Sequence, residues 1–92
     1  MRLVYSAEAL ADLVRLRAFI AEKDPSAATR IGLELVARIE NLAAFPRIGH
    51  AIGPDSPSGA LREMAFGNYV VRYSVHDGAL AILRVWHHYE DR

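Results

Sequence analysis

Residues 61–88 read LREMAFGNYVVRYSVHDGALAILRVWHH, and this stretch decides the fold of the chain. From Tyr69 to Val75 every second side chain is aromatic or β-branched, which is the period of a strand with one buried face. Asp77-Gly78 is typical of a hairpin turn, because both central positions of that turn need a positive φ. The stretch therefore predicts three short β-strands, of which residues 69–75 are the clearest.

The hairpin leaves two strand registers open. A two-residue loop at Asp77-Gly78 places Arg72 opposite Leu83, whereas a three-residue loop places Arg72 opposite Arg84. Two facing arginines repel each other unless an anion or an acidic side chain lies between them. The register therefore determines where the positive charge points, and the sequence does not choose between the two.

A strand and two helices are expected before these strands. Residues 2–5 are short and β-prone and end at Ser6, whose hydroxyl can cap the helix predicted over residues 7–23. Asp24-Pro25 supplies a cap and a proline at the first position of a second helix, which Pro46 stops. Both segments carry apolar stripes at helical spacing, so we expect an antiparallel helical hairpin. Gly32 lies inside the second helix, where only a close helix approach would explain it.

Residues 46–59 contain three prolines, three glycines and two serines, and are predicted to form a surface loop. Arg47 and His50 in this loop are either partner contacts or plain surface residues. Glu8 and Asp12 share one face of the first helix, and because nothing basic is expected near them, we interpret them as a solvated face.

Bulk composition limits the function. A chain of 92 residues is expected to be a single domain, 1–92, with a thin core, yet 52% of its residues are hydrophobic, which predicts an exposed apolar patch and a partner. The formal net charge of zero argues against a protein that binds nucleic acid by itself. Without cysteine, a signal-peptide pattern or a long apolar run, the chain is predicted to be cytoplasmic, with no membrane contact.

Several polar side chains near the end of the chain are candidate site residues. His87 and His88 are adjacent on a strand and point to opposite faces, so they do not chelate one ion, and we expect neither a metal nor a cofactor. Trp86 is either a core or rim aromatic residue or an anchor for a protein partner. Three arginines form either a cationic patch or separate ion pairs with nearby acidic residues: Arg62, Arg72 and Arg84.

The chain resembles the RelE/ParE toxin superfamily of bacterial type II toxin–antitoxin systems. The resemblance spans nearly the whole chain and is carried by Asp12-Leu13, Asp24-Pro25, 42–49, Arg62-Glu63, 67–73 and 82–87. It implies an α+β fold, in which an N-terminal strand and the helical hairpin pack on a small twisted antiparallel sheet. It also implies neutralisation by a cognate antitoxin, a segment of which orders on binding.

The two branches of the superfamily use different residues. A RelE-like toxin cleaves mRNA on the ribosome and needs a base, an acid and cations around one phosphate. In the RelE pattern an arginine follows the aromatic residue that opens the middle strand, but here Val70 follows Tyr69. A second arginine is expected after the last strand, where this chain has Glu90. A ParE-like toxin instead binds DNA gyrase and needs a protein-binding surface.

These departures favour a ParE-like toxin that inhibits gyrase by binding and is not itself an enzyme. Its predicted partner-binding residues are Arg62, Arg72, Arg84, Trp86 and His87. The first alternative is a RelE-like ribosome-dependent mRNA endonuclease, which would use His87, His88 and Tyr89 with Arg62, Arg72 and Arg84. The second alternative is a degenerate member that binds its antitoxin without being toxic.

Overall fold

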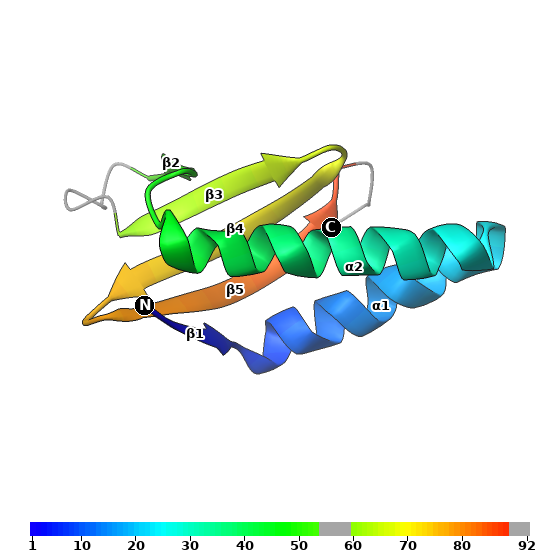
Figure 1. The fold of residues 1–92 in the computed structure, drawn as a ribbon, viewed down its shortest axis with the longest axis horizontal. Helices are drawn as coiled ribbons and strands as arrows, with labels where there is room; N and C mark the ends of the chain where they lie inside the picture. The colour runs from blue at the N-terminus through cyan, green and yellow to red at the C-terminus, as the bar shows by residue number, and fades with distance from the viewer. Residues whose placement is uncertain (54–59, 89–92) are drawn as a thin grey trace.

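The computed structural model describes residues 1–53 and 60–88 and shows an α+β fold (Figure 1). Two helices follow a first strand, and a series of strands completes a five-stranded sheet. The elements are β1 (Arg2–Tyr5), α1 (Ala7–Lys23), α2 (Pro25–Ala44), β2 (His50–Ala51), β3 (Leu61–Phe66), β4 (Tyr69–His76) and β5 (Ala79–His87). Neither helix, within the described part of the chain, has the length and apolarity to cross a membrane.

The predicted caps set the ends of both helices. The Ser6 hydroxyl accepts a hydrogen bond from the Ala9 N–H at 2.9 Å at the start of α1. Asp24 ends α1 and starts α2, where its carboxylate accepts from the Ala27 N–H at 3.1 Å. Because only this residue separates the helices, α2 returns along α1 as the expected antiparallel hairpin (Figure 1).

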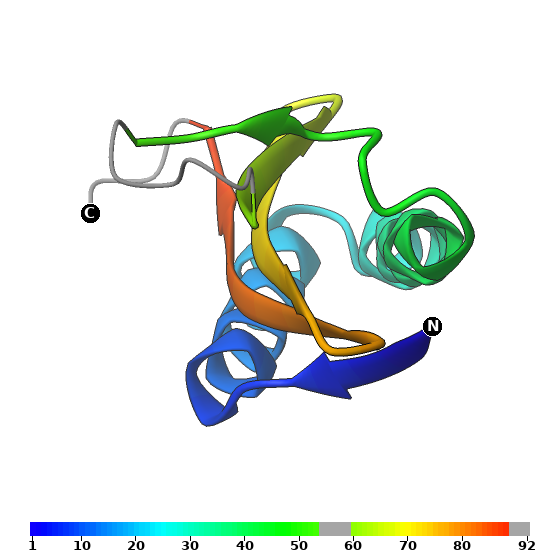
Figure 2. The ribbon, with the colours of Figure 1, turned by 90° about the vertical axis from the view of Figure 1, so that its left-hand side faces the viewer.

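The sheet has the strand order β1-β5-β4-β3-β2. The strands β3 to β5 pair in antiparallel fashion, as expected. β2 also pairs in antiparallel fashion with β3, and β1 makes the sheet mixed by pairing in parallel with β5. The very short β2 at the other edge lies in the segment predicted as a loop. α1 runs along β5, and α2 lies over the inner face of the twisted sheet (Figure 2).

The strands β4 and β5 adopt both registers that the sequence left open. Asp77 and Gly78 form a two-residue turn with φ of 47° and 75°, and Tyr73 pairs with Ile82. The next pair is Arg72 with Arg84, so Leu83 is an extra residue, a β-bulge. The bulge shifts the pairing by one residue, so that Val85 as well as Ile82 is buried.

The core lies between the hairpin and the inner face of the sheet. Three residues of β4 and three of β5 contribute buried side chains, which pack against the buried sides of both helices. The buried apolar residues of the helices are Ala9 and Leu16 on α1 and Ala28, Leu35, Ile39 and Leu42 on α2. The core is thin, as expected from the length of the chain, and it leaves the outer face of the sheet uncovered by helices (Figure 2).

Candidate functional site

Asp12 on α1 is 2% exposed and lies beside β5. Its Oδ2 accepts hydrogen bonds from Arg84 Nε at 2.7 Å and from the Val85 N–H at 2.9 Å. Its Oδ1 accepts from Arg15 Nη1 at 2.6 Å and from Arg84 Nη2 at 3.0 Å. The expectation that Asp12 belongs to a solvated face is wrong, because α1 turns this carboxylate toward the edge of β5.

The arginines keep the Asp12 carboxylate ionised. Burial alone raises the pKa of this carboxyl, but the hydrogen bonds from Arg84, Arg15 and the Val85 N–H outweigh burial and hold the pKa well below its usual value. The hydrogen bond to Asp12 in turn raises the pKa of the Arg84 guanidinium. Arg84 therefore forms an ion pair within the protein, and its guanidinium is directed at α1.

The same cluster closes one edge of the sheet. β1 covers β5 only from Ala79 to Ile82. Beyond that point Ser6 donates its hydroxyl proton to the Leu83 carbonyl at 2.9 Å, and Asp12 accepts from the Val85 N–H. The polar backbone groups of the bulge are thus satisfied by side chains of the first helix and its cap.

Arg72 lies on the outer face of the sheet beside Glu63 and Trp86. Its Nε donates to Glu63 Oε2 at 2.7 Å, and Glu63 is its direct cross-strand neighbour on β3. The guanidinium also lies over the Trp86 ring, 5.2 Å from the ring centroid. Because Arg72 turns to Glu63 and Arg84 turns to Asp12, two arginines can occupy directly opposed positions without repulsion.

Arg62 is held by backbone carbonyls. Its Nη1 donates to the Gly49 carbonyl at 2.5 Å and lies 3.4 Å from the Arg47 carbonyl. The three arginines of the predicted cationic patch are therefore directed at three separate partners: a loop, a strand and a helix.

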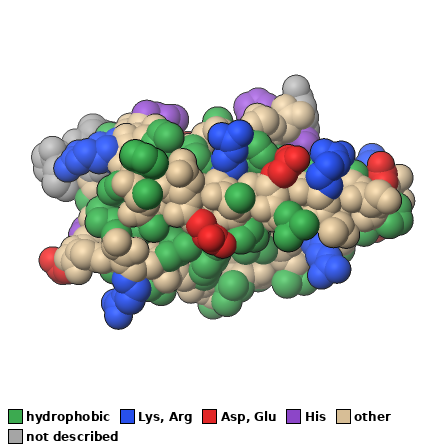
Figure 3. Space-filling view, in the orientation of Figure 1, with side chains coloured by type: hydrophobic (Ala, Val, Ile, Leu, Met, Phe, Trp, Pro, Cys, Tyr) green, Lys and Arg blue, Asp and Glu red, His purple; other side chains and the backbone are tan. Residues whose placement is uncertain are grey.

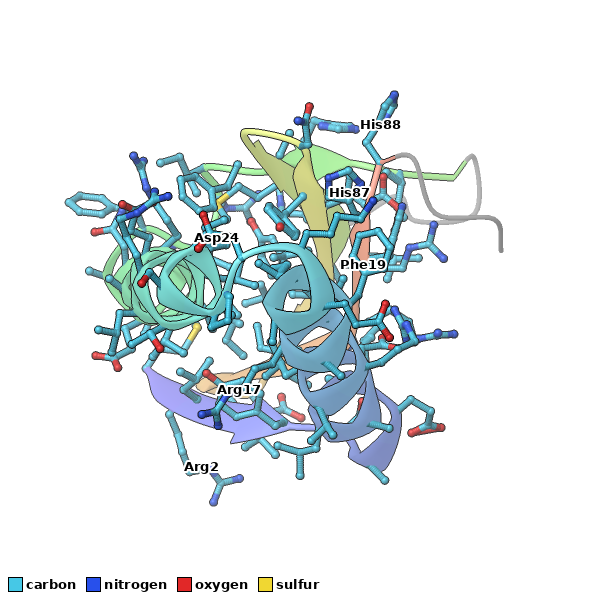
Figure 4. All side chains as sticks on the ribbon, turned by 90° about the vertical axis from the view of Figure 1, so that its right-hand side faces the viewer. Arg2, Arg17, Phe19, Asp24, His87 and His88 are labelled. Atoms are coloured by element: carbon cyan, nitrogen blue, oxygen red, sulfur yellow. The ribbon has the colours of Figure 1, made fainter. Side chains whose placement is uncertain are left out.

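The end of β5 separates the two histidines: His87 is the last residue of the strand, and His88 lies in the turn after it, not on the strand as expected. His87 pairs with Tyr69, with the two rings edge to face at 5.0 Å, and lies 6.1 Å from the Phe19 ring (Figure 4). The exposed His88 points away from Phe19 (Figure 4). Tyr89 lies outside the described residues, as does Glu90. Among residues 1–53 and 60–88 no three His, Cys, Asp or Glu side chains gather as a metal site.

A groove of about 360 Å³ runs between α1 and α2. Its wall is almost entirely apolar, and its one charged side chain is Arg17 (Figure 4). Six of the residues that line it are Leu13, Ile20, Ile31, Gly32, Leu33 and Val36. Hydrophobic side chains lie along both helices, separated by single charged ones (Figure 3). The groove is therefore one exposed apolar patch of the kind predicted from composition.

Gly32 lies in the wall of this groove. A Cβ built on Gly32 would have no atom within 4 Å, apart from the backbone of its own helix. A close approach of the two helices is therefore not the reason for this glycine, and its absent side chain instead widens the groove. Sequence reasoning missed this role, because periodicity places Gly32 beside the apolar stripe without showing that the hairpin leaves the position open.

Residues 3–92 match the family model described as the ParE toxin of the type II toxin–antitoxin system parDE. The chain belongs to the ParE toxin family. It is also 35% identical to Toxin RelE1 of Caulobacter vibrioides over 91 residues, covering 95% of this chain and 92% of that protein. Toxin RelE2 of the same organism is 36% identical over 87 residues, covering 94% and 93%. The ParE/RelE resemblance inferred from sequence is thus confirmed, and the chain is a type II toxin, which implies a cognate antitoxin.

Solved structures share the fold of this ParE-family toxin. A chain of the chromosomal ParDE system from P. aeruginosa aligns with a TM-score of 0.79 at 19% identity, covering 95% of each chain. Protein HP0894 of Helicobacter pylori aligns with a TM-score of 0.61 at 22% identity, covering 98% of this chain and 97% of that one. The order of strand, two helices and mixed sheet is therefore a known arrangement.

Proposed function

We propose that this ParE-family toxin acts by binding a protein target, DNA gyrase, and performs no chemistry of its own. The observation that supports the proposal most strongly is the separate engagement of Arg62, Arg72 and Arg84. A ribonuclease of this fold needs cations and an acid or base around one phosphate. Here each guanidinium is directed at its own carbonyl or carboxylate partner, and His87 faces the helix side.

Cleavage of mRNA is the second candidate, because the two Caulobacter relatives carry the name RelE. In that mechanism the exposed His88 would act together with Tyr89. A direct test separates the two functions. The purified toxin is added to a gyrase supercoiling reaction and, in parallel, to a translation reaction whose mRNA ends are mapped. We expect supercoiling to stop and the mRNA to stay intact.

A His88→Ala variant sharpens this test. The His88 side chain is exposed, so its removal leaves the core unchanged. If the toxin binds gyrase as proposed, His88→Ala inhibits supercoiling as strongly as the wild type. Cleavage of mRNA by the wild type that His88→Ala lacks would refute the gyrase proposal and establish the RelE-like function. An intact antitoxin complex with neither activity would identify a non-toxic member.

We propose that the antitoxin segment binds in the groove between α1 and α2. Apolar side chains of an ordering helix or strand would fill it, which explains how a chain with a thin core tolerates so much exposed apolar surface. Gly32 offers matched variants for the test. Gly32→Trp fills the groove and is expected to weaken antitoxin binding by at least about tenfold, whereas Gly32→Ala leaves most of the groove open. Equal affinities for the two variants would place the antitoxin elsewhere.

A further inference from the structure

The loop between α2 and β2 exposes large apolar side chains on a backbone that the protein holds in place. Phe45 is 60% exposed and Ile48 is 57% exposed, and the exposed Arg47 lies between them. Phe45, Pro46 and Ile48 line a shallow hollow together with Arg47. Exposed apolar residues of this size next to an arginine are the composition of protein-binding surfaces.

A buried tyrosine fixes this loop. Tyr73 on β4 is fully buried, and its hydroxyl donates to the Pro46 carbonyl at 2.7 Å and accepts from the Gly49 N–H at 3.0 Å. Arg62 adds a hydrogen bond to the Gly49 carbonyl. The Ile48 N–H donates a hydrogen bond to the Phe45 carbonyl at 3.1 Å, within the turn that these residues form. The backbone of residues 45–49 is thus tied to the sheet at several points.

Gly49 shows how closely the loop is fitted. A Cβ on this residue would lie 2.6 Å from the Glu63 carbonyl oxygen and 2.7 Å from the Tyr73 hydroxyl. No larger residue fits without moving the loop or the strand. The loop therefore keeps one conformation before any partner arrives, so binding loses little entropy there.

The charge around the loop indicates what kind of partner fits. Among the residues the structure describes, no carboxylate forms an ion pair with Arg47 or Arg62. Arg62 is satisfied by carbonyl oxygens, which leave its net charge in place. A segment that presents carboxylates beside apolar side chains would complement both the charge and the exposed Phe45 and Ile48.

The loop is also separate from the groove. The last residue of α2 in the groove wall is Val36, which lies eight residues, or about 12 Å along the helix axis, before Ala44 at the end of the helix. We infer that Phe45, Arg47 and Ile48 form a preorganised docking surface for an acidic, apolar segment of the toxin's target protein, distinct from the antitoxin groove. This inference rests on the proposed function, because it takes the target to be a protein.

The test uses the purified full-length toxin, gyrase and the cognate antitoxin. Phe45→Ser and Arg47→Glu are each expected to raise the concentration that inhibits supercoiling by at least about tenfold and to leave antitoxin affinity within about twofold of the wild type. The matched controls are Val14→Ser, at a 72% exposed apolar position outside the groove wall, and Arg30→Glu, an exposed charge reversal on α2. Both controls should behave as the wild type.

Each outcome decides between the two proposals. If the wild type inhibits gyrase and both loop variants inhibit equally well, the docking surface is refuted and the gyrase proposal stands. If the wild type does not inhibit gyrase but arrests growth, the gyrase proposal is refuted, and growth arrest becomes the readout. Loss of arrest in Phe45→Ser and Arg47→Glu, with the controls still toxic, then supports the docking surface, and retained arrest refutes it. A wild type inactive in both assays refutes both proposals.

Discussion

Replacing Asp12 by asparagine removes the charge from the centre of the ion cluster while keeping the size of the side chain. The carboxylate accepts four hydrogen bonds, two on each oxygen. An amide keeps one acceptor oxygen and turns an NH₂ group toward the remaining two donors. The variant therefore loses two charge-assisted bonds and gains a contact between donors.

The loss in unfolding free energy depends on whether the donors that lose their acceptor can form hydrogen bonds with water instead. A hydrogen bond to a charged group contributes about 1.5–3 kcal/mol, but the Arg15 and Arg84 side chains are 42% and 38% exposed and can turn to water. The Val85 N–H is buried and keeps the amide oxygen. We therefore expect Asp12→Asn to lower the free energy of unfolding by about 2–3 kcal/mol. Asp12→Ala also orphans the Val85 N–H and should cost about 1 kcal/mol more.

Urea denaturation at pH 7 measures these differences. With a slope of about 1 kcal/mol/M for a domain of this size, the Asp12→Asn midpoint should fall by about 2–3 M. Glu8→Gln, an exposed carboxylate one turn earlier in α1, is the control and should change the unfolding free energy by less than about 0.5 kcal/mol. If the unfolding free energy of Asp12→Asn lies within about 0.5 kcal/mol of the wild-type value, the cost of burying the carboxylate equals the stabilisation from its hydrogen bonds.

The pH dependence supplies an independent check. Because the pKa of Asp12 is lower in the folded than in the unfolded state, its contribution is complete above the unfolded pKa of about 4 and is lost as the pH falls through the folded pKa. The difference between wild type and Asp12→Asn should therefore be constant from about pH 6 to pH 8 and shrink below about pH 4. A difference that grows on acidification would contradict the assignment.

Three further predictions concern stability and are read from thermal or urea unfolding. Gly49→Ala should destabilise the protein by about 1–3 kcal/mol, since its Cβ meets the Glu63 carbonyl, and a neutral result would mean that the loop is free to move. Tyr73→Phe should cost about 1–3 kcal/mol by leaving the Gly49 N–H without its acceptor, and limited proteolysis should then cut the chain near Arg47. Gly32→Ala should instead stabilise by up to about 1 kcal/mol, and a loss would show that the position is more crowded than its open surroundings indicate.

Local signals in the sequence were sufficient for most of the fold. Ser6 and Asp24-Pro25 mark the helix starts through hydrogen bonds to residues only three positions away, so both partners of each bond lie within a short stretch of sequence. The period of β4 and the turn at Asp77-Gly78 are equally local. The short strand β2 was missed because two residues carry no period, and its pairing with β3 is a tertiary event.

The site was harder to predict, because its contacts join residues far apart in the chain. Asp12 and Arg84 are 72 positions apart in the chain, and the bulge at Leu83 brings them together. The sequence around Leu83 contains no turn residue that would indicate this bulge. Two clues were present: an arginine pair that needed an acidic partner, and an aspartate on the side of α1 that also carries Leu16. Joining them would have required knowing that β5 lies beside α1.

The parallel pairing of β1 with β5 has a consequence for the rate at which the protein folds. β3, β4 and β5 follow one another along the chain and are joined by short turns, so their ladders close quickly. Arg2 pairs with Ala79, so the first strand must wait until almost the whole chain has been brought together. We expect a folding transition state that contains the meander and the hairpin without β1. Mutations in β1 would then accelerate unfolding and leave the folding rate unchanged, which makes this edge the first part of the sheet to detach.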